Sequence, residues 1–191
     1  RPKTPWCARP RPSEKAAKSA DRTPAGPIRS GPVACLIPKT SPEFRVPYSL
    51  FISDLHLSPD TPAASNALRR FLDSTARDAE SLYVLGDLFE YWIGDDTLDS
   101  GAWRPLIDAF ASLAAQGVKL FFMHGNRDFL VGGRFEQATG MHVLADPTLI
   151  FLHGVPTLLM HGDTLCSDDQ EYQKFRTMVR SRAWQEEFLA K

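Results

Sequence analysis

Three short, continuously apolar runs separated by two amphipathic stretches constrain the fold of this chain more than any other feature. The apolar runs are "YSLFIS" (48–53), "SLYVLGD" (81–87) and "VKLFFMHGN" (118–126). The stretches between them, 62–80 and 103–117, have the period of helices that bury one side. Strands that are apolar throughout and joined by helices are typical of a parallel sheet covered on both faces. We therefore predict an α/β fold.

The pattern changes after the third strand. Two apolar runs, 148–152 and 156–160, flank His153-Gly154-Val155 with no helix between them, which predicts a β-hairpin. From Asp168 to the end, the composition is helical. In the first predicted helix, the residues expected to face the core are Ala67, Leu68, Phe71 and Leu72.

Residues 1–46 differ in composition from the rest of the chain. They hold ten Lys and Arg against three Asp and Glu, and nine of the 15 prolines. The stretch is too polar and too interrupted by proline to bury a core, and it lacks the apolar segment of a secretory signal. We predict a disordered leader, or translated sequence upstream of a true start near Val46. No aromatic residues alternate with its basic ones, so we expect no nucleic-acid binding.

The composition also excludes several classes of protein. The chain is 43% hydrophobic, which is enough for a core, and no apolar run approaches the length of a membrane span. Three scattered cysteines are too few for a disulfide framework or a cysteine zinc site, and they favour a reducing compartment.

Polar side chains capable of binding a metal follow each predicted strand. Asp54 and His56 follow the first, Asp87 the second and Asn126 the third, and His161 follows the hairpin. The carboxyl ends of parallel strands meet at one edge of a sheet, where ligands bind. Residues two apart in a strand point the same way, so we expect Asp54 and His56 to hold one ion together.

These residue types favour a particular metal chemistry. Carboxylate, imidazole and amide ligands without thiolate suit Mn²⁺, Fe²⁺ or Zn²⁺. Asp87, on the central strand, is placed to bridge two ions, and a pair of ions about 3.5–4 Å apart is the usual clamp for displacement at phosphorus. A lone Asp would more often be a turn residue or a helix cap, the role we assign to Asp146. A lone His would more often be a polar residue with its hydrogen bonds satisfied, the role we assign to His142 and His153. Four such motifs in order favour the metal site.

The motifs "DLHL", "GDLFE", "HGNRD" and "HGD" resemble those of the calcineurin-like metallophosphoesterases, from about residue 48 to the last residue. Arg127 stands where general members have histidine. Together with "GDLFEYWIGDD" and "HGDTLCSDDQEYQKFR", it makes the chain similar to the UDP-2,3-diacylglucosamine pyrophosphohydrolases, a family of lipid A biosynthesis. The resemblance implies an αββα sandwich with a helical lid insertion: a core over 47–163 and the start of the lid over 164–191.

The resemblance also implies a mechanism. A metal-activated hydroxide would attack the α-phosphorus of UDP-2,3-diacylglucosamine, giving UMP and 2,3-diacylglucosamine 1-phosphate (lipid X), with two divalent cations, usually Mn²⁺. Asp87, Asn126 and Arg127 would be catalytic, although Arg127 could instead be a surface residue paired with Asp128. By the same resemblance, Asp54 and His56 would bind the first metal, Asp87 both, Asn126 and His161 the second, and Asn126, Arg127 and Asp169 the substrate.

The expected lid carries an apolar stripe between basic residues, which suits an acylated, phosphorylated substrate at a membrane surface. The stripe consists of Phe175, Met178, Val179, Trp184, Phe188 and Leu189. An ordinary amphipathic helix docked on the core would have the same pattern. With the resemblance, this predicts a monomer bound peripherally to the cytoplasmic face of the bacterial inner membrane.

One expected motif has no counterpart in the sequence. The family pattern ends in Gly-His-Thr-His, whose two histidines add one ligand to each metal, and no histidine follows His161 here. We therefore expect a family member incomplete at its C-terminus, with impaired catalysis. Two alternatives stay open: another calcineurin-like phosphoesterase, which Arg127 and the lid-like tail oppose, and a non-catalytic remnant, which the missing histidines support.

Overall fold

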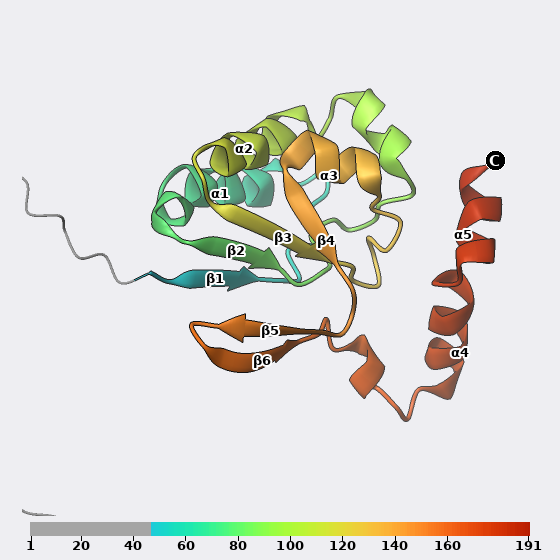
Figure 1. Ribbon diagram of the computed structural model, residues 1–191. Helices are drawn as coiled ribbons and strands as arrows, with labels where there is room; N and C mark the ends of the chain where they lie inside the picture. Colours follow the sequence, from blue (N-terminus) through green and yellow to red (C-terminus); the bar gives the residue numbers. More distant parts are fainter. Residues whose placement is uncertain (1–46) are drawn as a thin grey trace, which may run out of the picture. The chain divides into compact units, whose positions relative to one another are not determined.

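The computed structural model describes residues 47–191, and a four-stranded sheet lies at its centre (Figure 1). All four strands are parallel, in the order β1-β2-β3-β4. The parallel α/β class predicted from the sequence is confirmed, while the leader predicted over 1–46 lies outside the described residues. The strands are β1 (Ser49–Ile52), β2 (Ser81–Val84), β3 (Lys119–Met123) and β4 (Met141–Leu144).

Three helices cover one face of this sheet (Figure 1). They are α1 (Pro62–Asp73), α2 (Arg104–Ala115) and α3 (Gly133–Thr139). Alternate residues of β2, Leu82 and Val84, are fully buried in the core beneath them. Each such side chain contributes roughly 1.5–3 kcal/mol when it leaves water, so this core holds the sheet edge in place.

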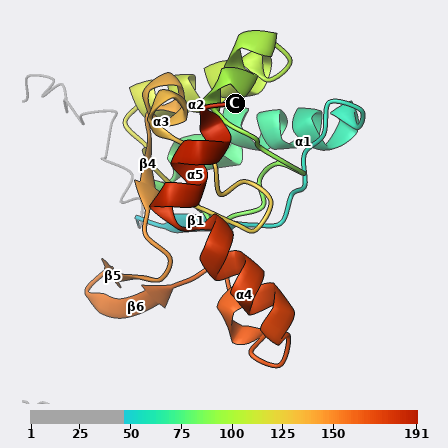
Figure 2. The same cartoon turned by 90° about the vertical axis from the view of Figure 1, so that its right-hand side faces the viewer.

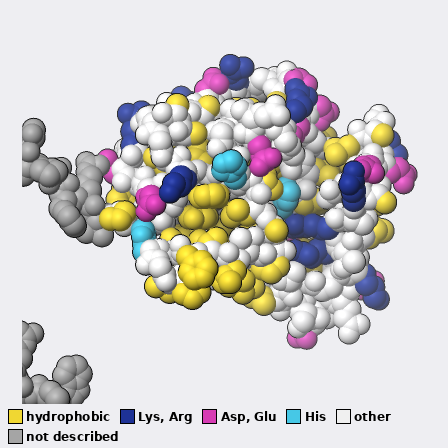
Figure 3. All heavy atoms as spheres, in the orientation of Figure 1, with side chains coloured by type: hydrophobic (Ala, Val, Ile, Leu, Met, Phe, Trp, Pro, Cys, Tyr) yellow, Lys and Arg dark blue, Asp and Glu magenta, His cyan; other side chains and the backbone are white. Residues whose placement is uncertain are grey.

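A β-hairpin, predicted for this part of the chain, packs on the other face of the sheet. It consists of β5 (Thr148–Leu152) and β6 (Val155–Leu159), paired antiparallel. Leu159 packs with Tyr83 and Met123 from the sheet. The hairpin's outer side chains, among them Leu149 and Phe151, are exposed, and Figure 3 shows hydrophobic side chains gathered over this part of the molecule.

Two further helices, α4 (Gln170–Val179) and α5 (Arg182–Leu189), follow the hairpin (Figure 2). Trp184 of α5 packs against the main core, with its ring 6.2 Å from that of Phe129. The segment therefore contacts the core, as an amphipathic helix docked on it would. The start of the predicted lid at residue 164 stays a prediction. Within residues 47–191, no helix combines the length and hydrophobicity needed to cross a membrane.

Two details of the predicted elements were wrong. The helix predicted over 62–80 ends at Asp73, because the chain then tightens into a 3₁₀ turn at Thr75–Asp78, and Ala67 is exposed. The sequence did not predict α3 and β4. At seven and four residues they are too short to show a period.

Candidate metal centre

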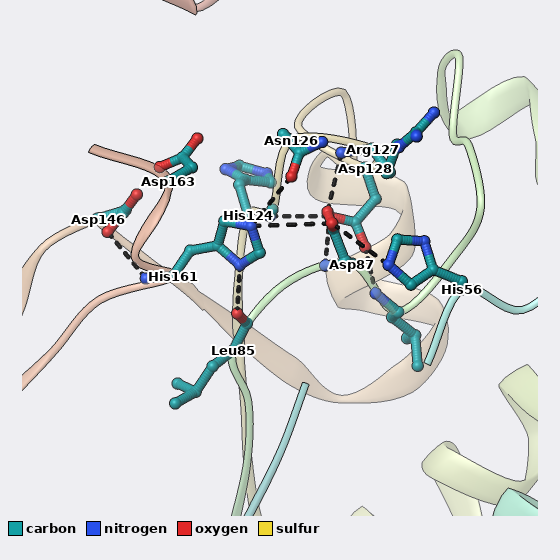
Figure 4. A network of polar contacts seen from close by, with 12 residues as sticks. His56, Leu85, Asp87, His124, Asn126, Arg127, Asp128, Asp146, His161 and Asp163 are labelled. Atoms are coloured by element: carbon teal, nitrogen blue, oxygen red, sulfur yellow. Dashed lines mark hydrogen bonds and ion pairs between the residues drawn. The ribbon is translucent and has the colours of Figure 1, made fainter. Parts of the chain in front are cut away.

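The loops that follow β1, β2, β3 and β6 bring the five predicted metal ligands to one edge of the sheet. Figure 4 shows His56, Asp87, Asn126 and His161 there. Asp54, His56 and Asp87 each offer an atom that lies within 4.8 Å of the other two. His161 Nε2 lies 3.8 Å from Asp87 Oδ2 and 3.2 Å from Asn126 Oδ1. Asp87 thus lies between the Asp54–His56 pair and the Asn126–His161 pair. That these residues bind metal, with Asp87 as a bridge, stays a prediction.

The reason we gave for the convergence of Asp54 and His56 was wrong. The pair lies beyond the end of β1, in a loop where both residues have left-handed backbones, with φ of 56° and 46°. The backbone amides of Asp54 and His56 donate to Gly86 O and Asp87 O, at 3.1 and 3.0 Å. Left-handed residues other than glycine cost about 1–2 kcal/mol each and cluster at functional sites. Pairing with the β2 loop, rather than strand alternation, turns both side chains inward.

Asp87 has the geometry of a bridging ligand. It is buried, and Oδ1 accepts a hydrogen bond from the backbone N of Arg127 at 2.9 Å. Oδ2 lies 3.7 Å from His56 Nε2 and 3.8 Å from His161 Nε2. One oxygen is therefore fixed by the backbone, while the other lies between two imidazoles at distances that leave room for a cation on each side.

Polar contacts fix the orientation of both imidazoles. His161 Nδ1 lies 2.9 Å from Leu85 O; a carbonyl only accepts, so Nδ1 carries the proton and Nε2 presents its lone pair to Asn126 Oδ1. Two acceptors that face each other at 3.2 Å are stabilised by a cation. His56 Nδ1 similarly faces Glu90 Oε2 at 3.1 Å, the carboxylate–histidine arrangement typical of metal sites. The residues thus fit a pair of divalent cations.

A buried carboxylate that the sequence did not single out, Asp128, ties two of the loops together. It accepts hydrogen bonds from the backbone N atoms of Gly125 and Leu88, at 2.9 and 2.8 Å, and a longer one from Asp87 N at 3.3 Å. Burial raises the pKa of Asp128 to about 6, against the opposing effect of these bonds. An Asp directly after an Arg looked like half of a surface ion pair, so the sequence carried no signal for this role.

Gly125 is required by the close approach of the same two loops. A Cβ at this position would lie 2.1 Å from Asp87 Oδ1 and 2.2 Å from the backbone N of Asp87. Real Cβ atoms do not approach so closely, so only glycine lets the loop after β3 lie against the Asp87 turn.

The remaining candidate residues lie around this centre. Arg127 Nη1 lies 3.7 Å from Glu90 Oε1, so the surface pair with Asp128 that we considered for it was wrong. Asp169 is exposed and caps α4, its carboxylate accepting from the backbone N of Tyr172 at 3.0 Å. Asp146 does more than form a turn, because it accepts from the backbone N of His161 at 3.2 Å.

The histidines left out of the predicted ligand set have other contacts. His124 Nε2 donates to Val131 O at 2.7 Å, and burial lowers the pKa of His124. His142 lies on β4 beside Phe121, with ring centroids 6.2 Å apart. His153 lies in the hairpin turn, where Nδ1 is 4.0 Å from Glu80 Oε2.

Curated proteins with known names match much of this chain. Over 142 residues the chain is 51% identical to a UDP-2,3-diacylglucosamine hydrolase of Xanthomonas campestris pv. campestris (strain B100) and 49% identical to one of Stenotrophomonas maltophilia (strain K279a). Each match covers 74% of this chain and 57% of the relative, so the chain spans little more than half the length of these curated relatives.

Among solved structures, the nuclease MPE of Pseudomonas putida matches 53% of this chain and 50% of its own, at 18% identity and a TM-score of 0.40, too weak a likeness to bear on fold or function. The sequence pattern described as calcineurin-like phosphoesterase matches residues 49–191, which include every ligand candidate named above. The chain belongs to the calcineurin-like phosphoesterase family.

Proposed function

We propose that the protein hydrolyses the pyrophosphate bond of UDP-2,3-diacylglucosamine, releasing UMP and 2,3-diacylglucosamine 1-phosphate. The substrate is inferred from the 51% identity to a relative named UDP-2,3-diacylglucosamine hydrolase. The chemistry is supported by the grouping of carboxylates, imidazoles and an amide around Asp87, which suits two divalent cations, with Mn²⁺ the metal we favour.

Each residue of the centre has a part in this reaction. Asp54 and His56 would hold one cation, Asn126 and His161 the other, and Asp87 both. Bound cations would supply an activated water and neutralise the charge that grows on the phosphoryl oxygens. Glu90 and the carbonyl of Leu85 keep the two imidazoles turned so that Nε2 faces inward.

Arg127 is the residue we propose for binding the substrate's phosphates. Its side chain is 52% exposed, and its Nη1 lies 3.7 Å from Glu90 Oε1. Its backbone N donates a hydrogen bond to Asp87 Oδ1. A half-exposed guanidinium next to the bridging carboxylate can reach a phosphate with a two-pronged hydrogen bond, at the cost of a weak surface ion pair. Asn126 and Asp169 complete the proposed substrate contacts.

The C-terminal helices support a lipid substrate. Phe175, Met178 and Leu189 are about half exposed, on helices that also carry lysines and arginines. Exposed apolar side chains next to basic ones are typical of helices that lie in a membrane interface. We propose a monomer that acts on the cytoplasmic face of the bacterial inner membrane, by peripheral association and without binding nucleic acid.

The test measures UMP release from UDP-2,3-diacylglucosamine by the purified protein supplied with Mn²⁺. We expect release that stops when a chelator removes the metal and that is absent from Asp87→Ala. Asp108→Asn is the matched control, because that carboxylate is exposed and pairs with Arg104 one helical turn away. Hydrolysis of simple phosphodiesters without UMP release would instead indicate another phosphoesterase, and bound Mn²⁺ without any hydrolysis would contradict the enzymatic proposal.

A further inference from the structure

Arg176 of α4 and Arg180, which directly follows α4, reach the carboxylates beside the candidate metal centre. Arg176 Nη2 lies 2.7 Å from Asp146 Oδ2, and Arg176 Nε lies 2.8 Å from Asp163 Oδ2. Figure 3 shows basic side chains gathered where α4 faces the rest of the domain. Tyr172 adds a third contact, its hydroxyl donating to Asp163 Oδ2 at 2.6 Å. Although burial raises the pKa of Asp163, hydrogen bonds from Arg176 and Tyr172 outweigh it and hold the pKa below its usual value.

Arg176 is connected through Asp146 to His161, a candidate metal ligand. Asp146 uses one oxygen for Arg176. Its other oxygen, Oδ1, accepts from the backbone N of His161 (Figure 4). Asp163 lies two residues after His161 on the same loop. Arg176 therefore fixes the loop of His161 from two points, through Asp146 and through Asp163.

Arg180 makes the equivalent contact with the loop of Asn126. Its Nη2 donates to the carbonyl of Gly125 at 2.8 Å, and its guanidinium lies over the ring of Phe129, 5.7 Å from the centroid. Gly125 directly precedes Asn126, and Phe129 follows it by three residues. The same side chain lies 3.8 Å from Asp163 Oδ2, so Arg180 connects the Asn126 loop to the His161 loop.

These contacts are too well buried to be incidental surface pairs. The side chains of Asp146 and Asp163 are 4% and 7% exposed, and those of Arg176 and Arg180 are 16% and 17% exposed. Removing one partner of a buried ion pair leaves an uncompensated charge, which costs far more than the loss of a surface pair. If α4 left its position, two buried carboxylates next to His161 would lose their partners, and their loop would rearrange.

We infer that Arg176 and Arg180 are positioning residues for Asn126 and His161, so that docking of α4 and binding of the cation by this half of the centre stabilise each other. The inference rests on the proposed two-cation centre. Coupling between two sites is reciprocal: the factor by which docked α4 tightens cation binding equals the factor by which the cation favours docking. The Asp54–His56 half has no such contact with α4 among the described interactions.

Cation affinity tests one direction of this coupling. We would titrate the full chain with Mn²⁺ and follow free Mn²⁺ by electron paramagnetic resonance, comparing wild type with Arg180→Gln. Loss of a positive charge near a cation site strengthens cation binding if electrostatics alone acts. Loss of positioning weakens it, and we expect one of the two Mn²⁺ affinities to fall about tenfold, within the usual range of coupling. The sign of the change separates the two explanations.

Arg182→Gln is the matched control. It removes the same charge from a position two residues away, where the side chain is 90% exposed and pairs with Glu186 one turn along α5. We expect its two Mn²⁺ affinities to match those of the wild type. Arg180→Lys keeps the charge but not the planar fork, so it should recover only part of the lost affinity.

Hydrogen exchange tests the reverse direction on the unmodified chain, whatever the folding of the variants. We expect Mn²⁺ to slow amide exchange in residues 170–180 by about the same factor as Arg180→Gln lowers the affinity for Mn²⁺. Mn²⁺ binding that leaves exchange in α4 unchanged, or an Arg180→Gln affinity equal to or tighter than that of the wild type, would overturn the coupling while leaving the proposed function intact. A wild-type chain that binds no Mn²⁺ would overturn both.

Discussion

The Asp54–His56 half of the candidate metal centre is fixed by backbone hydrogen bonds between neighbouring loops, whereas the Asn126–His161 half is fixed largely by side chains from distant parts of the chain. The first half uses the amides of Asp54 and His56, which bond to the loop after β2. In the second, Asp146 and Arg180 connect segments 15 and 55 residues apart. The backbone bonds of the first half thus lie between the loops after β1 and β2, while the contacts of the second also involve Asp146 and the end of α4.

Asp87 belongs to both halves, so its removal should have the largest effect. Asp87→Ala takes away the oxygen that lies 3.7 Å from His56 Nε2 and 3.8 Å from His161 Nε2. We expect Mn²⁺ binding to disappear from both positions, and UMP release with it. The Asp54–His56 pair would keep only one carboxylate, and the Asn126–His161 pair would have none. Calorimetric Mn²⁺ titration checks this; a variant that keeps one tight Mn²⁺ would show that the halves bind independently of Asp87.

Gly125→Ala should disrupt the contact between the halves without removing any ligand. The new Cβ would lie 2.1 Å from Asp87 Oδ1, so one loop must move. Overpacking of this kind costs about 3 kcal/mol, which for a domain of this size lowers the Tm by about 6–12 °C. Thermal unfolding followed by circular dichroism measures the change.

Gly133→Ala is the control for that substitution, since a Cβ there meets nothing within 4 Å and the position lies in the first turn of α3. Its Tm should stay the same or rise, because alanine favours helix over glycine by about 1 kcal/mol. Equal Tm values for the two alanine variants would show that the loops are not as closely packed as the glycine indicates.

Asn126→Ala should affect the two cation positions differently. Asn126 Oδ1 lies 3.2 Å from His161 Nε2, and its loss leaves the Asp54, His56 and Asp87 group complete. We expect one Mn²⁺ to bind with nearly wild-type affinity and the other to weaken at least tenfold. Two affinities that fall together would mean that the halves are one cooperative unit.

The sequence predicted which residues converge better than it predicted the contacts that hold them there. Parallel strands that end in polar residues bring their ligands to one edge whatever the details, so the group around Asp87 could be foreseen. Asp128, Glu90 and Arg180 act through bonds that span about 30 to 55 residues, and a lone carboxylate or arginine carries no pattern that announces such a partner. The left-handed backbone of Asp54 and His56 was also invisible, because neither residue is glycine.

The smallest effect should come from Glu90→Gln, which changes the group that orients His56 and removes a weak ion pair with Arg127. Glu90 Oε2 lies 3.1 Å from His56 Nδ1, and the Glu90 side chain is 39% exposed, so solvent screens part of its charge. The amide of Gln still offers an oxygen to the same N–H, which keeps the ring turned while lowering its basicity. We expect about a tenfold loss of affinity at the first cation position, the lower end of the effect of such partners, and no change at the second.

The corresponding group for His161 is the carbonyl of Leu85, which no side-chain substitution removes. In the first half, the orientation of the imidazole therefore depends on a side chain, Glu90, which also lies beside Arg127. In the second half, the imidazole contacts the backbone directly after β2. If Glu90→Gln weakened both Mn²⁺ affinities equally, the exposed carboxylate would be acting through the charge of the whole centre rather than through His56, and the division of the site into two differently built halves would be wrong.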